Sequence, residues 1–577
     1  MSIPTDPPQL RTASIVAGAP LSAEPCLGAL TIPEYLREVT TRFGPREALV
    51  MGCGNGIVRW SYAQLWEHSA ELARALLAAG VGKNSRVGVL MSNRPEFVAA
   101  AFGIALAGGV SVVLSTFSTP PELEHLIRVS GVSILLYEPR VARKDFDDVL
   151  LGLEPAIKHT GPLWSARFPF LRRLVRLGET GATGPGAGAI ESWSQFLQGA
   201  HSVPLSLMEA AAATVKPSDA AVMFFSSGTT GLPKGILHAQ RAAAIQWWRW
   251  PRILGVTDDA RCWTANGFSW SGQFSMILGC GLSTGGTVVL QPTFEPEEAL
   301  ELIQAERVTI PFAWPHQWAK LRGAANWDTV DLSSLRYVDP RSPLAQHPTV
   351  RTTGDWYEPP AYGATETFTI VAAFPNFRPG PGKEHLQGPV LPANTVKIVD
   401  PFSGAVVPRG QRGEIAVKGP TLMLGYSGIP LDETLDADGF FHSGDGGYLD
   451  ETGQLFWEGR LSDIIKTGGA NVSPREIDTI LSGYPGVKLS RTVGVPHDTL
   501  GEMVVACVVP HDGTVLEETV IRDFLKARLA SYKVPRRLLF FRQEEIAMTG
   551  SDKVKADALV RQAAARLALE VSTGRRS

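Results

Sequence analysis

The stretch from Ser226 to Gly235, SSGTTGLPKG, combines hydroxyl side chains, glycines and one lysine directly after an apolar run. The apolar run, residues 221–225, predicts a buried strand that leads into a loop. Glycines let backbone N–H groups turn toward one point, and the lysine adds a positive charge, so the loop is suited to binding a polyphosphate. It is not a Walker A loop, because Pro233 stands where the last glycine before the lysine would be. A plain surface turn is the alternative, but such a turn rarely needs this combination.

Further polar segments follow in the second half of the chain, and each carries groups that could act on a nucleotide. They are YGATET at Tyr362–Thr367, HSGDGGY at His442–Tyr448, GRLSDIIKTGG at Gly459–Gly469 and TGSDK at Thr549–Lys553. Taken singly, each has an ordinary structural explanation. Asp445 alone is typical of a turn, Glu366 of a solvated carboxylate and Lys553 of a surface lysine.

The composition limits the class of protein. A chain of 577 residues is too long for one hydrophobic core and predicts at least two domains. With 44% hydrophobic and 19% charged residues it resembles a soluble globular protein, and its net charge of −3 argues against nucleic acid as a partner. The five cysteines form no CxxC pair, which indicates neither a zinc site nor a disulfide framework and favours a cytoplasmic location. The N-terminus lacks the pattern of a signal peptide.

The first half of the chain alternates predicted helices and strands. Residues 61–64 have the spacing of a capping box, Gly80 ends the helix that follows, and residues 86–91 predict a strand. Residues 97–114 are uncharged and long enough for a membrane span. We interpret them as a buried helix to Ala107, a stop at Gly108–Gly109 and a strand over 110–114. This alternation predicts an α/β fold with largely parallel sheets covered by helices, which bind ligands at the carboxyl ends of their strands.

A second, smaller domain is predicted after Arg460. A strand over 504–509, a helix over about 517–529 and a strand over 538–541 are typical of a small α+β domain. We place the boundary between residues 461 and 462, which gives domains of 1–461 and 462–577. The glycine-rich residues 178–189 predict a flexible insertion within the first domain.

In this order and spacing, the polar segments resemble those of the adenylate-forming superfamily, which includes acyl-CoA synthetases, the adenylation domains of peptide synthetases and beetle luciferases. The resemblance covers about residues 31–559. It implies a large N-terminal domain and a small mobile C-terminal domain that carries a catalytic lysine. It also implies a two-step reaction with ATP, Mg²⁺ and CoA. A carboxylate attacks the α-phosphate of ATP and releases pyrophosphate, and a thiolate then displaces AMP from the acyl-adenylate.

The resemblance also implies a role for each matching residue of the large domain. Thr365 would contact the α-phosphate, Glu366 would hold Mg²⁺, and Asp445 with Arg460 would bind the ribose. The residues that would cradle the β- and γ-phosphates are Ser226, Ser227, Gly228, Thr229, Thr230, Gly231 and Lys234. Those that would lie against the nucleotide are Tyr362, Gly363, Ala364 and Thr367.

The small domain would contribute two lysines in turn. Lys553 would stabilise charge near the α-phosphate during adenylation. Rotation about a hinge at Ser462 would then withdraw Lys553 and bring Lys466 to the site for the thioester step. The face that would accompany Lys466 and bind CoA consists of Gly468, Gly469, Ala470 and Asn471.

Some residues depart from the family pattern. The hinge is often Asp or Lys and here is Ser462, and the residue before the catalytic lysine is usually Gly and here is Asp552. A carboxylate beside Lys553 could pair with it and weaken its pull on ATP. Asp339–Pro340–Arg341 replaces a glycine-rich turn beside the adenine and acyl pocket, and we expect Arg341 to face solvent rather than the substrate.

The residues expected near the acyl group favour a hydrophobic acid, either fatty or alicyclic/aromatic. Ser269 stands where amino-acid-activating relatives have an aspartate that pairs with the α-ammonium, which argues against an amino acid. Tryptophans at 263, 270, 314 and 318 lie in the same region. For each of them two interpretations stay open, a residue that lines the acyl pocket or a residue of the hydrophobic core. We predict Phe268 and Trp270 as pocket residues.

The acceptor of the acyl group stays open between alternatives. A freestanding acyl-CoA synthetase, acting on a small carboxylic acid, ATP and CoA without a membrane segment, is the leading interpretation. A homodimer is compatible with the sequence. An acyl-AMP ligase that loads a separate carrier protein is the second, and a catalytically weakened acyl- or adenylate-binding protein is the third.

Overall fold

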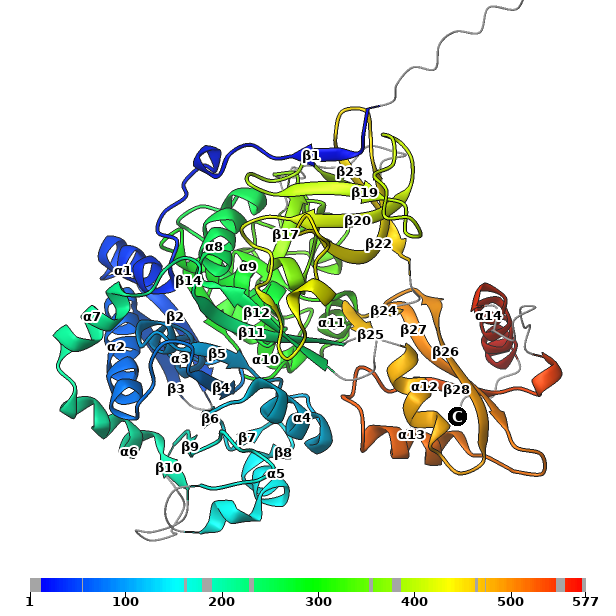
Figure 1. Cartoon of the computed structure of the whole chain (residues 1–577), viewed down its shortest axis with the longest axis horizontal. Coiled ribbons are helices and arrows are strands. Elements are labelled where there is room, and N and C mark those ends of the chain that lie inside the picture. Colours follow the sequence, from blue (N-terminus) through cyan, green and yellow to red (C-terminus); the bar gives the residue numbers. More distant parts are fainter. Residues whose placement is uncertain are drawn as a thin grey trace, which may run out of the picture.

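The computed structural model describes residues 12–53, 56–159, 163–178, 189–227, 233–351, 356–375, 385–461, 465–472, 474–545 and 556–572. We call residues 12–461 the large unit and residues 465–572 the small unit. Figure 1 shows the small unit, in orange and red, at one side of the large unit, which holds three extended sheets. The α/β class predicted from the sequence is confirmed.

The first sheet of the large unit has eight strands and carries the phosphate-loop segment. Its order is β10-β9-β6-β4-β5-β11-β12-β21, parallel from β10 to β11 and antiparallel beyond. The bounds are β10 Ile190–Ser192, β9 Arg173–Arg176, β6 Ile134–Tyr137, β4 Arg86–Leu90, β5 Val110–Val113, β11 Ala220–Ser227, β12 Pro233–Ala239 and β21 Gly425–Tyr426.

The membrane-length apolar run belongs to this sheet and its cover. Helix α3 (Pro95–Leu106) is buried along almost its whole length, Gly108 has a positive φ of 80°, and β5 follows. The predicted helix, stop and strand are therefore confirmed. No helix in the described ranges combines the length and apolar character that crossing a membrane requires.

The second sheet has five strands in the order β15-β13-β14-β2-β3. Its strands are β15 Ile310–Phe312, β13 Arg261–Thr264, β14 Thr287–Leu290, β2 Glu47–Cys53 and β3 Gly56–Ser61, with only β3 antiparallel. Much of the core lies between these two sheets, where α1 (Ile32–Phe43), α2 (Tyr62–Ala78), α8 (Gln240–Leu254) and α9 (Ser271–Leu282) pack with α3. Ser61 caps α2 in the predicted capping box.

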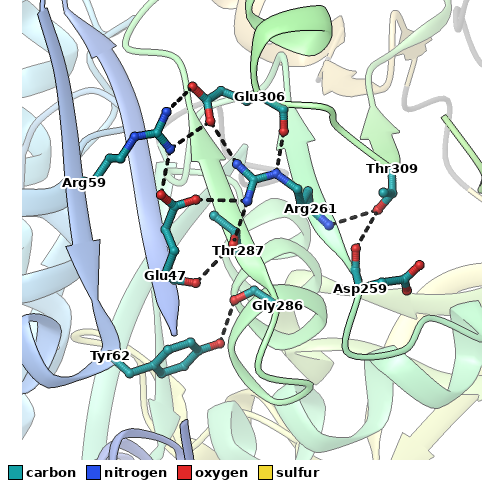
Figure 2. A network of polar contacts seen from close by, with 9 residues as sticks. All are labelled: Glu47, Arg59, Tyr62, Asp259, Arg261, Gly286, Thr287, Glu306 and Thr309. Carbon is teal, nitrogen blue, oxygen red and sulfur yellow. Dashed lines mark hydrogen bonds and ion pairs between the residues drawn. The ribbon is translucent and has the colours of Figure 1, made fainter. Parts of the chain in front are cut away.

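An ion-pair network joins the starting ends of the parallel strands in this second sheet to the final end of the antiparallel β3 (Figure 2). Glu306, almost fully buried, accepts hydrogen bonds from both Arg59 and Arg261. Glu47 accepts from the same two guanidinium groups, at 2.6 and 2.9 Å. Burial would raise the pKa of Glu47, but the two arginines outweigh it and hold the pKa below its usual value. This network fixes the strand edge opposite the one where ligands are expected.

The third sheet differs from the largely parallel prediction because all of its strands are antiparallel. Its order is β1-β19-β20-β22-β23-β18, with β1 Ile15–Ala17, β19 Thr395–Val399, β20 Gly413–Lys418, β22 Phe441–Leu449, β23 Leu455–Arg460 and β18 Leu386–Gly388. A two-stranded hairpin, β16 (Ala361–Ala364) with β17 (Thr369–Ala373), lies beside it. The remaining strands and α-helices in the described part of the large unit are β7 Arg140–Val141, β8 Lys144–Asp145, α4 Pro120–Ser130, α5 Phe146–Leu153, α6 Trp193–Gln198, α7 Leu205–Ala213, α10 Pro296–Ala305 and α11 Pro315–Arg322.

The small unit is an α+β fold, as its pattern predicted. Its sheet has the order β25-β24-β27-β26, and β28 pairs with β27. The elements are β24 Ile465–Thr467, β25 Ala470–Val472, α12 Pro474–Ser482, β26 Val487–His497, β27 Gly501–Pro510, α13 Glu518–Lys526, β28 Arg537–Phe540 and α14 Ala556–Ser572. Residues 462–464 lie outside the described ranges. The hinge at Ser462 and the domain boundary just before it therefore stay predictions.

Asp478 on α12 makes the stability of the small unit dependent on pH. Thr492 donates to its Oδ1 at 2.7 Å, while its Oδ2 lies 3.8 Å from Arg491, and burial raises its pKa to about 7. The unfolded value is about 4, so the folded state loses stability as the pH rises between about 4 and 7. We expect Asp478→Asn, which removes this charge, to raise the free energy of unfolding by about 2 kcal/mol at pH 8 and by much less near pH 5.

Calorimetric unfolding of the parent and the variant at both pH values tests this expectation. Ser490→Ala, which removes a neighbouring hydrogen bond to the Asp478 carbonyl without changing charge, is the control. An equal change at pH 5 and pH 8 would contradict the role of Asp478.

Candidate active site

A cavity of about 710 Å³ lies where the two units meet. The large unit contributes the β11–β12 hairpin, the segment around Tyr362–Glu366 and strand β22. The small unit contributes Lys466, Gly469 and Tyr532. Because β11 ends here and pairs in parallel with β5, the cavity lies at the carboxyl edge of the first sheet. Segments that are far apart in the sequence and were each predicted to act on a nucleotide therefore share one space.

The phosphate-loop candidate connects two antiparallel strands. In the hairpin, Ser226 lies opposite Lys234 and Ser227 opposite Pro233. Ser226 and Lys234 line the cavity. A helix follows the loop in Walker A proteins, so the strand that follows here is a further difference from them. Gly228, Thr229, Thr230 and Gly231 lie outside the described residues, and their roles stay predictions.

The turn at Tyr362–Thr367 is held in one conformation by close backbone contacts. A Cβ at Gly363 would lie 1.4 Å from the Thr369 carbonyl oxygen, so only glycine fits there. The Thr367 hydroxyl accepts from the Ala364 N–H at 2.9 Å. Phe368 and Thr369 follow with φ of 49° and 91°, a conformation that non-glycine residues rarely adopt. Burial of Phe368 in the core helps to maintain this turn, which presents Thr365 and Glu366 to the cavity.

Two candidates for the nucleoside contact each other directly. The Tyr362 hydroxyl donates to Asp445 Oδ2 at 2.9 Å, and both side chains are buried at the wall of the cavity. Asp445 also lies opposite Arg460 in the β22–β23 ladder, and the ribose-binding role of the two residues stays a prediction. The side chain of Arg460 lies outside the described residues.

Glu366 is joined to Lys234 through a residue that the sequence did not indicate. The Tyr426 hydroxyl donates to Glu366 Oε1 at 2.8 Å, and Lys234 Nζ lies 4.9 Å from the centre of the same ring. All three line the cavity. Tyr426 reaches this place because β21 pairs with β12, and no local motif marks it.

A second polar group at the cavity was also missed. His442 lies in the HSGDGGY segment, and the sequence predicted no role for it; its ring nitrogens lie 3.0 Å from Glu414 and 3.3 Å from Asp436. Burial alone would raise the pKa of Asp436. Hydrogen bonds, of which the one from Lys397 has the largest effect, outweigh burial and lower this pKa to about 2. Asp436 is therefore ionised at neutral pH and anchors His442 beside Asp445.

The two predicted acyl-pocket residues lie in different places. Trp270 and Ser269 line the cavity, and the Trp270 ring contacts Trp314 and Tyr532 at centroid distances of 5.2 and 5.4 Å. Phe268 is buried in the core against Phe97 and is not among the residues that line this cavity.

The remaining aromatic and charged candidates of this region lie in the core or face solvent. Trp263 and Trp318 pack in the hydrophobic cluster beneath α10 and α11. Arg341 is exposed and paired with Asp339, as expected.

The small unit presents the Lys466 face to the cavity. Lys466 Nζ lies 3.2 Å from the centre of the Trp457 ring, and the backbone N–H of Lys466 donates to Glu502 Oε2 at 2.6 Å. A Cβ at Gly469, which has φ of 85°, would lie 2.6 Å from the Trp314 ring, so glycine permits this close docking. Ala470 is buried in β25, and the side chain of Asn471 lies outside the described residues, as do Asp552 and Lys553.

Comparisons with known proteins agree with this geometry. Residues 36–427 match the AMP-binding enzyme family, and residues 476–553 match the AMP-binding enzyme C-terminal domain. A feruloyl-CoA synthase of Amycolatopsis sp is 30% identical over 529 residues, which is 89% of this chain and 95% of the relative. An indoleacetate–CoA ligase of Aromatoleum aromaticum is 31% identical, with coverage of 88% and 93%.

Among solved structures, the amide bond synthetase McbA of Marinactinospora thermotolerans has a TM-score of 0.72 at 27% identity, with 92% of this chain and 99% of that chain covered. The matched ranges span both units and contain cavity residues such as Lys234, Tyr362 and Glu366, while Asp445 and Lys466 lie between the two ranges. The chain is therefore a member of the AMP-binding enzyme family, the adenylate-forming enzymes whose curated relatives include acyl-CoA ligases.

Proposed function

We propose that this enzyme activates a hydrophobic, aromatic carboxylic acid with ATP and transfers the acyl group to CoA. The observation that carries the proposal is the convergence of Tyr362–Asp445, Glu366–Tyr426–Lys234 and Lys466 on one cavity. Each group matches one part of the chemistry: the nucleoside, the phosphates with their metal, and the transfer step.

The first half-reaction needs charge neutralisation around the α-phosphate, where the carboxylate attacks. Lys234 offers a positive charge and Thr365 a hydroxyl to the phosphates, while Asp445 orients the ribose. Positioning of this kind makes the attack effectively intramolecular. Lys553 would complete the charge neutralisation when it reaches the site.

Glu366 is suited to binding Mg²⁺. Its carboxylate is a hard oxygen ligand at the cavity, and within the described residues only Oε1 has a hydrogen-bond donor, Tyr426. Phosphate oxygens and water would supply the other ligands of the ion. When bound, Mg²⁺ offsets the negative charge that pyrophosphate carries as it leaves.

In the second half-reaction, Lys466 would lie near the acyl-adenylate. AMP is a good leaving group, and the attacking thiolate and the departing phosphate are both negative. A positive charge held over Trp457 stabilises both. The observed orientation of the small unit therefore supports acyl transfer as the step for which this face is used.

The aromatic character of the acid is supported by the cavity wall and the relatives. Trp270, Trp314 and Tyr532 form a cluster of rings next to Ser269, with no carboxylate at that position to pair with an α-ammonium. The relatives named above act, by their names, on feruloyl and indoleacetate groups.

A panel of acids tests the function. Cinnamic, arylacetic, benzoic, medium-chain fatty and amino acids are each scored by pyrophosphate exchange into ATP and by CoA-dependent AMP release. We expect both signals, strongest with aryl acids. Exchange without turnover on CoA would point to a carrier-protein or amine acceptor instead, and absence of exchange with every acid would favour a binding protein.

A further inference from the structure

A buried ion-pair cluster joins the two units at a distance from the catalytic groups. Lys533 of the small unit lies 2.9 Å from Glu476 Oε1 of the same unit and 3.2 Å from Glu122 Oε1 of the large unit. The side chains are 3%, 6% and 8% exposed, respectively. Removing one partner of a buried pair leaves an uncompensated buried charge, which costs far more than breaking a surface pair.

Glu122 uses its two carboxylate oxygens for different purposes. Oε2 accepts from the Thr119 N–H at 2.9 Å and from its hydroxyl at 3.1 Å, which forms the capping box of α4. Oε1 faces the small unit and accepts from Lys533 and from the Ala530 N–H at 3.1 Å. The cap belongs to the large unit alone, while the Oε1 contacts exist only when the small unit is docked in this orientation.

The cluster is connected to the cavity through adjacent residues. Tyr532, next to Lys533 in the chain, contacts Trp270 at the cavity wall. At the other end of the docked face, Gly469 lies against Trp314, which also contacts Trp270. The orientation that satisfies Glu122 is therefore the one that places Lys466 and Gly469 in the cavity.

We propose that Glu122 is a positioning residue for acyl transfer, which holds the small unit in the orientation that presents Lys466. Glu122 is not among the residues that line the cavity. This inference rests on the proposed function for the kinetic role of Lys466, but its structural half, the docking of the small unit, does not.

Glu122→Gln is the informative variant. Glutamine supports a capping box as well as glutamate does, so α4 keeps its start. To keep that cap, the glutamine side chain must turn its amide oxygen toward Thr119. Its NH₂ group then faces the Lys533 ammonium and the Ala530 N–H, which are both donors and cannot accept a hydrogen bond from it. The interface then loses both contacts. Glu34→Gln is the control, because Glu34 likewise accepts from the hydroxyl of the N-cap threonine, Thr31, at the start of α1 and is exposed.

The kinetic test separates the two half-reactions of the full-length protein. We expect Glu122→Gln to slow the reaction of preformed acyl-AMP with CoA at least about tenfold, with acyl-AMP formation changed less than about twofold. Glu34→Gln should leave both rates unchanged. Equal slowing of both half-reactions by Glu122→Gln would show general damage and overturn the proposal, as would unchanged rates.

A distance measurement tests the structural half without any activity. Spin labels are attached at Ser202→Cys and Asp512→Cys, which are both exposed positions. Cys26, which is exposed, and Cys53 are first replaced by serine, and the other three cysteines are buried. We expect Glu122→Gln to add a population at a distance that the parent and Glu34→Gln lack. Identical distributions would overturn the proposal. If the acid panel fails but the distances shift, only the proposed function falls.

Discussion

Lys466→Ala is expected to slow the reaction of acyl-AMP with CoA by about 10²–10³-fold, the range measured when a single charge-stabilising group is removed from an enzyme. Acyl-AMP formation should remain within about threefold of the parent, because no phosphate of ATP has to be neutralised by this lysine in the first step. Single-turnover measurement of each half-reaction, with acyl-AMP supplied for the second, provides both rates.

The physical reason is the placement of the ammonium group. Lys466 Nζ is held over the face of Trp457 and points into the cavity from a short strand that docks through Gly469. Alanine removes the charge and leaves β24 and its pairing with β25 in place. A neutral side chain there leaves two like charges, thiolate and phosphate, without an offsetting cation.

Two other lysines serve as comparisons for this prediction. Lys488→Ala, at an exposed position of β26, should affect neither half-reaction. Lys553→Ala should show the opposite bias, with acyl-AMP formation reduced by orders of magnitude and acyl transfer largely kept. Loss of the first half-reaction in Lys466→Ala would mean that the two lysines have been assigned to the wrong steps.

Glu366→Gln is expected to slow acyl-AMP formation by about 100-fold or more and to raise the Mg²⁺ concentration needed for half-maximal rate. The substitution removes the carboxylate charge that would bind the ion. The amide oxygen can still accept from the Tyr426 hydroxyl, so the shape of the site is kept. Pyrophosphate exchange, measured across a series of Mg²⁺ concentrations, tests both parts.

Two neighbouring substitutions separate metal binding from the general charge of the cavity. Glu433→Gln removes another carboxylate that lines the cavity and should leave the Mg²⁺ dependence unchanged. Tyr426→Phe removes the hydrogen bond but not the charge, and should slow the reaction by about tenfold or less. A Glu366→Gln enzyme with the Mg²⁺ dependence of the parent would exclude this residue as a ligand.

Much of the local structure could be predicted because it depends on neighbouring residues. The capping box at Ser61, the glycine stop at Gly108 and the strand before Ser226 each depend on propensities that act over a few residues, and each is present. The motif segments could be predicted for a related reason, since groups that bind a nucleotide lie together in short loops. The family resemblance then linked these segments to one reaction.

Other features could not be predicted from local pattern. The antiparallel third sheet was missed because strands rich in glycine and polar residues, such as β22 (FHSGDGGYL), have no strong apolar alternation in their sequence. Phe268 and Trp270 are two residues apart and equally aromatic, yet one enters the core and the other the cavity. Packing against Phe97 decides this difference, and Phe97 lies in a helix far away in the sequence.

By itself, the sequence determined the chemical inventory and the local elements: which loops carry phosphate-binding, carboxylate and lysine groups, and which strands and helices hold them. Only the tertiary structure decided which groups meet, such as Tyr362 with Asp445, Tyr426 with Glu366, and Glu122 with Lys533. The physical reason is range. Propensity and capping act between near neighbours, whereas these contacts join residues 60 to 411 positions apart and form only when sheets and units pack.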